Sequence, residues 1–247
     1  MIYLKNSYEI SEIKKACSIW KKVREDITSF VKIGVSLIEI DSLVKSLEKK
    51  YDFTCTFYNY NGFPGNICIS VNDVVIHGIP TSYKLKNKDL VTFDIGITYN
   101  KYVCDAAFTL IVGEETLETK KINEICYQSL MKGIAEIHPN KRIGDISNAI
   151  QIHSERNGFK VIKNFGGHGC GKHLHEDPTI LNYGEPGTGA KLVPGMILCI
   201  EPMLLTDSDD YYISSDKWSV VSSNHLLTCH WEHMVLVTSD GYEILTE

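Results

Sequence analysis

Residues 90–112 read LVTFDIGITYNKYVCDAAFTLIV, a stretch made of two apolar runs, 90–99 and 102–112. Both runs are rich in β-branched and aromatic residues, which favour β-strands. Each run holds a single acidic residue, Asp94 in the first and Asp105 in the second. Burying an ionised carboxylate costs several kcal/mol unless a cation or strong hydrogen-bond donors compensate it. The stretch therefore predicts two strands whose acidic side chains need a compensating partner.

Two later apolar runs repeat this pattern. Glu201 is the only acid in LVPGMILCIEPMLL (192–205), and Glu232 is the only acid in CHWEHMVLV (229–237). For any one of the four acids, the alternative is a carboxylate on the solvent face of a half-exposed strand. None of the four runs contains Lys or Arg, so an ion pair would need a partner from elsewhere in the chain. Bound metal ions are the simplest compensation for all four together.

Three histidines stand where they could join such a site. His168 and His175 lie in GGHGCGKHLHEDP (166–178), whose glycines predict a turn at His168 and a close backbone approach to a ligand. His77 ends the apolar run ICISVNDVVIHG (67–78). Three others are expected near the site but not as ligands: His173, His230 and His233. No role is assigned to the remaining three: His138, His153 and His225.

The types of side chain that could bind metal indicate which reaction the site supports. Four carboxylates and one imidazole are too rich in oxygen for a structural zinc site, which favours thiolates and imidazoles. Carboxylates can bridge two cations, and paired cations about 3.5–4 Å apart can activate a water molecule and polarise a carbonyl group. The chain contains no GxSxG motif, no Walker loop and no GxGxxG before a helix. The residues therefore predict metal-assisted hydrolysis.

Amphipathic spacing predicts four helices, at 7–33, 36–51, 117–137 and 144–157. Gly34 is expected to end the first helix and Gly158 the last. Ser36 and Glu39 form a capping box at the start of the second. Strand-like runs follow each helix pair, at 67–78, 90–99, 102–112, 196–205, 225–230 and 232–237. Helices followed by strands in each half predict an α+β fold.

The two halves are also alike in sequence. Adding 106 to the residue number carries Lys14 and Lys15 onto Lys120 and Lys121, Ile40 onto Ile146, and Phe53 onto Phe159. The alternative to an internal duplication is a set of chance matches. A length of 247 residues permits one large domain or two small ones. We expect a single domain, 1–247, built from repeats at about 7–112 and 113–245.

Composition narrows the classes of function. The hydrophobic fraction of 43% is that of a globular protein, and no apolar run is long enough for a membrane span. A net charge of -6 gives no general reason to bind nucleic acid or an anionic membrane. The start of the chain does not read as a secretory signal, and the eight cysteines form no CxxC pair. We therefore expect a soluble cytoplasmic protein with free thiols.

In their order and spacing, these motifs resemble the type I methionine aminopeptidases of the short, bacterial type. The likeness runs from about Asn6 to Leu245 and is carried by NGFPGNICISVNDVVIHGIP, FDIG, CDAAFT, GHGCGKHLHEDP, CIEPM and HWEHMVLVT. It implies the pita-bread fold, in which two pseudo-symmetric halves enclose a dinuclear metal site between their sheets. It also implies removal of the initiator methionine from nascent polypeptides, with preference for a small second residue.

The resemblance assigns roles to the acids and histidines. It implies five ligands for two divalent ions, which could be Co, Mn, Fe or Zn: Asp94, Asp105, His168, Glu201 and Glu232. In the family pattern Asp94 binds the first ion, Asp105 and Glu232 bridge both, and His168 and Glu201 bind the second. Three residues take part in catalysis. Glu201 moves a proton, His175 stabilises the developing oxyanion, and His77 contacts the peptide on its leaving-group side.

The resemblance also implies a pocket for the methionine side chain, lined by Tyr60, Phe63, Cys68 and Trp218. Read without the family, these four are ordinary core residues. Three positions that bear on the shape of the pocket depart from the family pattern: Phe57, Leu174 and Cys104. In some relatives backbone carbonyls at three further positions hold a monovalent cation: Asn72, Val74 and Thr228.

Two alternatives stay open at this stage. The first is a proline-specific peptidase of the same fold, although such enzymes carry a further N-terminal domain and only about six residues precede the first helix here. The second is a non-enzymatic relative that binds ribosomes or RNA, a type that usually lacks metal ligands. As partners we expect nascent chain ends and a transient ribosome contact, with no membrane and no specific nucleic acid, and we expect a monomer.

Overall fold

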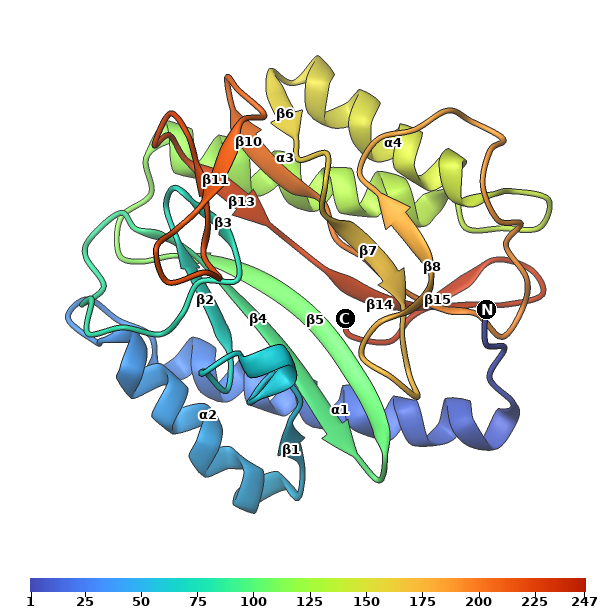
Figure 1. The fold of residues 1–247 in the computed structure, drawn as a ribbon, viewed down its shortest axis with the longest axis horizontal. Coiled ribbons are helices and arrows are strands. Elements are labelled where there is room, and N and C mark those ends of the chain that lie inside the picture. Colours follow the sequence, from blue (N-terminus) through green and yellow to red (C-terminus); the bar gives the residue numbers. More distant parts are fainter.

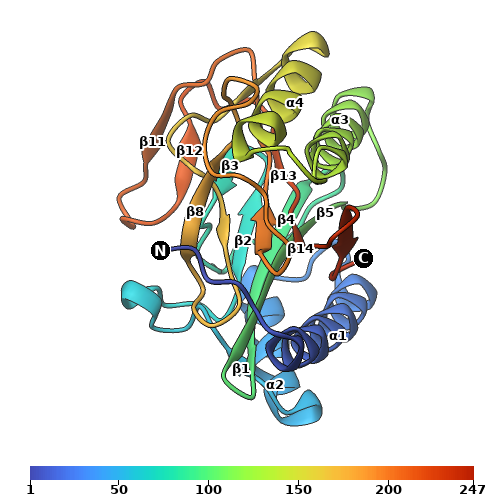
Figure 2. The same cartoon turned by 90° about the vertical axis from the view of Figure 1, so that its right-hand side faces the viewer.

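Four α-helices flank the strands in the computed structural model, which describes residues 1–247. They are α1 (Ser7–Phe30), α2 (Leu37–Tyr51), α3 (Leu117–Ala135) and α4 (Ile143–Arg156). Helices α1 and α2 cover one side of the molecule and α3 and α4 the other, with the strands between them (Figures 1 and 2). No helix combines the length and the apolar character needed to cross a membrane.

The predicted helices are confirmed, with one boundary wrong. The capping box of α2 is present, since Glu39 N–H donates to Ser36 Oγ at 3.3 Å and Ser36 N–H donates to Glu39 Oε2 at 2.8 Å. Helix α1 ends at Phe30 rather than at Gly34, because Val31 already has extended backbone angles. Gly34, with φ of +90°, lies in the turn that follows.

Fifteen strands form four antiparallel sheets. The first sheet contains β1 (Thr54–Cys55), β4 (Leu90–Tyr99), β2 (Cys68–Val71) and β5 (Tyr102–Ile111). The second contains β13 (Thr228–His230), β10 (Met203–Thr206) and β6 (Phe159–Val161). The third contains β11 (Tyr211–Ile213), β12 (Val220–Ser222) and β3 (Val74–Ile76). The fourth contains β15 (Tyr242–Ile244), β14 (His233–Val237), β9 (Ile197–Ile200), β7 (Gly166–Gly169) and β8 (Glu176–Leu181).

Each of the six predicted strand runs contains at least one observed strand, and the α+β class is confirmed. Seven short strands lie outside those runs: β1, β6, β7, β8, β11, β12 and β15. The predicted turn at His168 is wrong, because this residue lies within β7. Its glycine neighbours instead let adjacent strands come close. A Cβ on Gly167 would lie 2.0 Å from the carbonyl oxygen of Cys199 on β9.

The larger part of the core packs α1 and α2 against the first sheet. The fully buried Trp20 ring of α1 meets Phe108 of β5 edge-on at 6.1 Å and donates its indole N–H to the carbonyl of Ile95 at 3.1 Å. A second apolar cluster includes residues of α3 and α4, such as Leu130 and Ile146. These contacts fix the strands that carry the acidic side chains, since helices pack against the first and the fourth sheet.

Candidate active site

The hairpin of β4 and β5 places two carboxylates side by side. Asp105 lies directly opposite Gly96, and Asp94 lies opposite Ala107. Because residues two apart on a strand share a face, Asp94 and Asp105 are diagonal neighbours on the same face of the sheet. Asp94 and Asp105 are eleven residues apart in the chain, and the antiparallel register of the hairpin brings them together.

The five-stranded sheet supplies the other donors. His168 on β7 lies opposite Cys199 on β9, and Glu201 directly follows that strand. Glu232 directly precedes β14, and its backbone N–H donates to the carbonyl of Ala107 on β5 at 3.0 Å. This hydrogen bond joins the two sheets at the site. Donors from both halves of the chain thus meet at one place.

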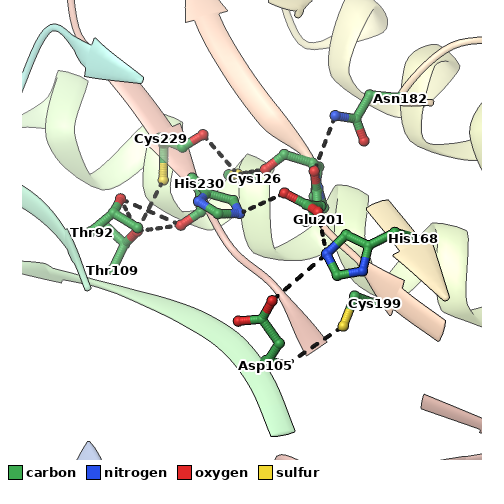
Figure 3. Close-up of polar contacts among 11 residues, drawn as sticks. Thr92, Asp105, Thr109, Cys126, His168, Asn182, Cys199, Glu201, Cys229 and His230 are labelled. Atoms are coloured by element: carbon green, nitrogen blue, oxygen red, sulfur yellow. Dashed lines mark hydrogen bonds and ion pairs between the residues drawn. The ribbon is translucent and has the colours of Figure 1, made fainter. Parts of the chain in front are cut away.

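The side chains of Asp105 and Glu201 point toward the ring of His168 (Figure 3). Its Nε2 lies 3.7 Å from Asp105 Oδ2 and 3.6 Å from Glu201 Oε1. Ligand atoms of Asp105, His168 and Glu232 lie within 4.8 Å of one another. One oxygen each of Asp94, Asp105 and Glu232 is buried and has no hydrogen-bond partner. Buried carboxylate oxygens without donors are expected where a cation binds.

The electrostatics of the donors favour the binding of a positive charge at this place. Burial raises the pKa of Asp105 to about 7. The pKa values of Asp94, Glu201 and Glu232 are also raised well above their usual range. Burial is the larger cause, and repulsion from neighbouring carboxylates is the smaller one. Burial lowers the pKa of His168 to about 4, so its imidazole is neutral, the form that binds metals. The residues therefore fit a site for divalent metal.

Cys199 is a competing donor that the sequence did not single out. Its Sγ belongs to the same 4.8 Å cluster, whereas Asp94 and Glu201 do not. Burial raises the pKa of this thiol well above its usual range, and Sγ instead donates to the carbonyl oxygen of Asp105 at 3.7 Å. Because a thiol must lose its proton to bind metal, the oxygen-rich set of four acids and His168 is the better ligand set.

A cleft of about 780 Å³ lies over these donors. All eleven site residues named from the sequence line it: Tyr60, Phe63, Cys68, His77, Asp94, Asp105, His168, His175, Glu201, Trp218 and Glu232. Phe57 and Leu174, two of the departures from the family pattern, line it as well. The third departure, Cys104, is fully buried in the core and does not reach the cleft. The structure thus brings the whole predicted set to one place.

Two further histidines border the candidate metal donors. Nδ1 of His175 lies 2.9 Å from the Tyr60 hydroxyl, and its ring meets that of His168 edge-on at 4.4 Å. His77, which follows β3, has a φ of +57°. Burial lowers the pKa of His77 to about 4 and that of His175 below its usual value. Both rings are therefore neutral near pH 7 and can each donate one hydrogen bond.

An apolar corner of the cleft lies beside Asp94. Cys68 on β2 is the direct cross-strand neighbour of Asp94 and is buried. The rings of Phe63 and Trp218 pack edge-on at 5.2 Å, and the ring of His77 lies 6.4 Å from Trp218. Aromatic and sulfur groups suit an apolar, polarisable side chain such as that of methionine.

One contact near the site was not predicted from the sequence, and two others involve the residues of the predicted monovalent-cation site. Asn182 of the loop after β8 donates its Nδ2 to the carbonyl oxygen of Glu201 at 3.0 Å. The Thr228 hydroxyl lies 2.9 and 3.0 Å from the carbonyl oxygens of Asn72 and Val74. These two carbonyls converge as the monovalent site requires, and that site stays a prediction. No sequence pattern marks Asn182, because its role depends on a contact between distant strands.

Comparison with known proteins agrees with this chemistry. The profile of metallopeptidase family M24 matches residues 11–239. A methionine aminopeptidase of Mycoplasma genitalium is 43% identical over 247 residues, which cover 100% of both chains. The crystal structure of methionine aminopeptidase from Rickettsia prowazekii superposes with a TM-score of 0.98 at 33% identity, again over 100% of both chains.

A more distant likeness concerns the fold alone. Prolidase from Pyrococcus furiosus superposes with a TM-score of 0.79 at 23% identity, and the alignment covers 99% of this chain and 65% of that one. The pita-bread fold implied by the resemblance is confirmed, and residues from both halves of the chain line the cleft. With a profile match over most of its length and full-length relatives above 30% identity, the chain belongs to metallopeptidase family M24, among its bacterial methionine aminopeptidases.

Proposed function

We infer that the chain is an aminopeptidase that removes the N-terminal methionine from polypeptides by metal-dependent hydrolysis of the first peptide bond. The observation that carries this conclusion is the convergence of His168 and four carboxylates, two buried and two partly buried, beneath a cleft with an apolar, sulfur-containing corner. Full-length similarity to curated methionine aminopeptidases supports the same activity.

We propose that five residues hold two divalent ions. Asp94 would bind the first ion, Asp105 and Glu232 would bridge both, and His168 and Glu201 would bind the second. When bound, such ions lower the pKa of a coordinated water and polarise the scissile carbonyl. The diagonal placement of Asp94 and Asp105 and the unpartnered oxygens of three acids support this assignment. Whether the ions are Co, Mn, Fe or Zn depends on availability as much as on the ligands.

Three residues of the chain would transfer the proton and stabilise the negative charge that develops during the reaction. Glu201 would accept a proton from the attacking water at its carboxylate and pass it to the leaving amine. His175 would donate its Nε2–H to the carbonyl oxygen as negative charge develops there, since Nδ1 faces the Tyr60 hydroxyl. His77 would contact the peptide on the leaving-group side. The neutral state of both imidazoles supports their role as donors.

The methionine side chain would enter the corner formed by four residues: Tyr60, Phe63, Cys68 and Trp218. Their position beside Asp94 supports this placement, because the bond to be cut must lie next to the metal donors. We propose that a small second residue is preferred. Phe57 and Leu174 line the same cleft and would influence that preference.

The alternatives are less well supported. The likeness to prolidase is at 23% identity and concerns the fold, whereas the methionine aminopeptidases align over the full length at up to 43% identity. A non-enzymatic binding role does not require four carboxylates with unfavourable charge repulsion at one place. Retaining all of them has a cost in stability that metal binding explains.

We propose that the substrates are nascent polypeptide ends and that the enzyme acts as a monomer in the cytoplasm, with a transient ribosome contact. The eight cysteines form no disulfide, which supports a reducing compartment. The net charge of -6 gives no reason to expect specific nucleic acid binding. We further propose that the domain, 1–247, consists of two repeats at about 7–112 and 113–245.

Mass analysis of short peptides tests the function. We expect the protein with Co²⁺ or Mn²⁺ to release Met from Met-Ala-Ser, to act more slowly on Met-Leu-Ser, and to leave Ala-Pro-Ser intact. An Asp105→Asn variant purified in the same way is the control, because it keeps the shape of the side chain but removes a proposed ligand. Preferential cleavage of the X-Pro peptide would overturn the proposal.

A further inference from the structure

The imidazole of His230 faces one of the metal donors directly. His230 ends β13, two residues before Glu232, and is only 1% exposed. Its Nε2 lies 3.6 Å from Glu201 Oε2 and has no hydrogen-bond partner (Figure 3). The other oxygen of the same carboxylate, Oε1, faces His168 at 3.6 Å. The Glu201 carboxylate thus lies between two imidazoles, and the resemblance to the family assigns only one of them.

The backbone of His230 is fixed by the hairpin that carries the other acids. The Thr109 hydroxyl on β5 donates to the carbonyl oxygen of His230 at 2.6 Å. The Thr92 hydroxyl on β4 lies 2.8 Å from that of Thr109 and 3.5 Å from the same carbonyl. Strands β4 and β5 also carry Asp94 and Asp105. The backbone of His230 is therefore held against the hairpin that carries Asp94 and Asp105.

Hydrogen-bond chemistry determines which group donates. An ionised carboxylate can only accept, so the nitrogen that faces it must carry the hydrogen to be satisfied. A separation of 3.6 Å is longer than a formed hydrogen bond, and contacts in active sites often shorten when ligands bind. Groups that orient a metal-binding carboxylate in this way typically alter metal affinity by about 10–100-fold when they are removed.

We propose that His230 is a positioning residue that donates its Nε2–H to Glu201 Oε2 and so holds the other oxygen, Oε1, toward the metal. This rests on the proposed function, because it assumes that Glu201 binds metal. The imidazole does not touch the substrate in this role. It acts through Glu201, and its removal changes metal binding before it changes the chemistry.

Titration of the chelator-treated protein with Co²⁺, followed by calorimetry and by the visible absorption of the bound ion, tests this role. His230→Leu and His230→Met lack the donor, whereas His230→Gln keeps an N–H at a similar position. We expect the His230→Leu and His230→Met variants to have a Co²⁺ Kd about 10–100-fold higher than wild type and a changed absorption spectrum. The His230→Gln variant should keep a Kd and a spectrum close to those of wild type. Activity of the Leu and Met variants should recover at saturating Co²⁺.

His233→Leu is the matched control. His233 is equally buried at 1% exposure and flanks Glu232 on the other side, but its Nδ1 contacts the Thr246 hydroxyl at 2.9 Å. It should bind Co²⁺ like wild type. Wild-type affinity in both the Leu and the Met variants, or a Gln variant as weak as they are, would overturn the role of His230. Wild-type protein that binds no Co²⁺ would instead refute the proposed metal site itself.

Discussion

The hydroxyl of Tyr60 lies 2.9 Å from Nδ1 of His175, although 115 residues separate them in the sequence. Tyr60 belongs to the short helix η1 (Tyr60–Gly62), and His175 directly precedes β8. A phenol that donates to Nδ1 leaves the hydrogen of the ring on Nε2. The contact therefore allows the tautomer that the proposed role of His175, donation of a hydrogen bond to a developing oxyanion, requires.

Replacing Tyr60 with phenylalanine removes this hydroxyl while keeping the ring in the cleft. The net value of one hydrogen bond is about 0.5–1.5 kcal/mol, so we expect kcat for Met-Ala-Ser to fall about 2–10-fold with little change in bound metal. Steady-state kinetics and metal analysis measure the two effects. Tyr58→Phe, at a tyrosine that is 50% exposed, is the control. An unchanged kcat would show that the contact does not matter for turnover.

Asp105→Asn should lower the activity of the enzyme and, without metal, raise its stability. The variant should lose metal and nearly all activity, because a proposed bridging ligand is gone. In the presence of a chelator it should be more stable than wild type by on the order of 1–3 kcal/mol, since a buried charge without a partner is removed. Urea denaturation followed by circular dichroism measures this difference. A variant that is less stable than wild type under these conditions would contradict the electrostatic account of the site.

The same difference in stability should depend on pH. Burial raises the pKa of Asp105 in the folded chain to about 7, whereas the unfolded value is about 4. Below about pH 4 the group is protonated in both states, so its contribution to stability is intact. Between about pH 4 and 7 Asp105 loses its proton in the unfolded chain but keeps it in the folded chain. The free energy of unfolding of the wild type therefore falls as the pH rises through this range.

The advantage of Asp105→Asn in chelator should therefore grow from pH 5 to pH 7 and level off above that. Denaturation curves at pH 5, 6, 7 and 8 for both proteins provide the test. Comparing the two proteins cancels the contributions of titratable groups that do not contact residue 105. An advantage that shrinks as pH rises would mean that Asp105 is ionised in the folded chain at low pH.

Trp218→Ala should weaken binding of the methionine side chain. The substitution removes the ring that packs against Phe63 at 5.2 Å in the apolar corner of the cleft. An aromatic contact of about 1.4 kcal/mol corresponds to a roughly tenfold loss of kcat/KM, which we expect mainly as a higher KM for Met-Ala-Ser. Tyr212→Ala, at an aromatic residue that is 43% exposed, is the control. Equal kcat/KM in both variants would exclude Trp218 from the pocket.

Much of the fold follows from local patterns in the sequence. The capping box at Ser36 and the apolar stripe through Trp20 and Ile27 locate two helices, because the signals lie within a few residues of one another. Strands as short as β7 and β12 carry too few residues for a periodic signal. They form because neighbouring strands and helices hold them in place.

The sequence by itself determined the helices, the longer strands and the identity of the four acids, because an acid within an apolar run is visible without any knowledge of its neighbours. Only the tertiary structure decided that Asp94 and Asp105 share a face and that the Tyr60 hydroxyl meets His175. It alone placed the ring of His230 against Glu201, across 29 residues of sequence. Such contacts depend on register and packing between distant segments, which local sequence does not encode.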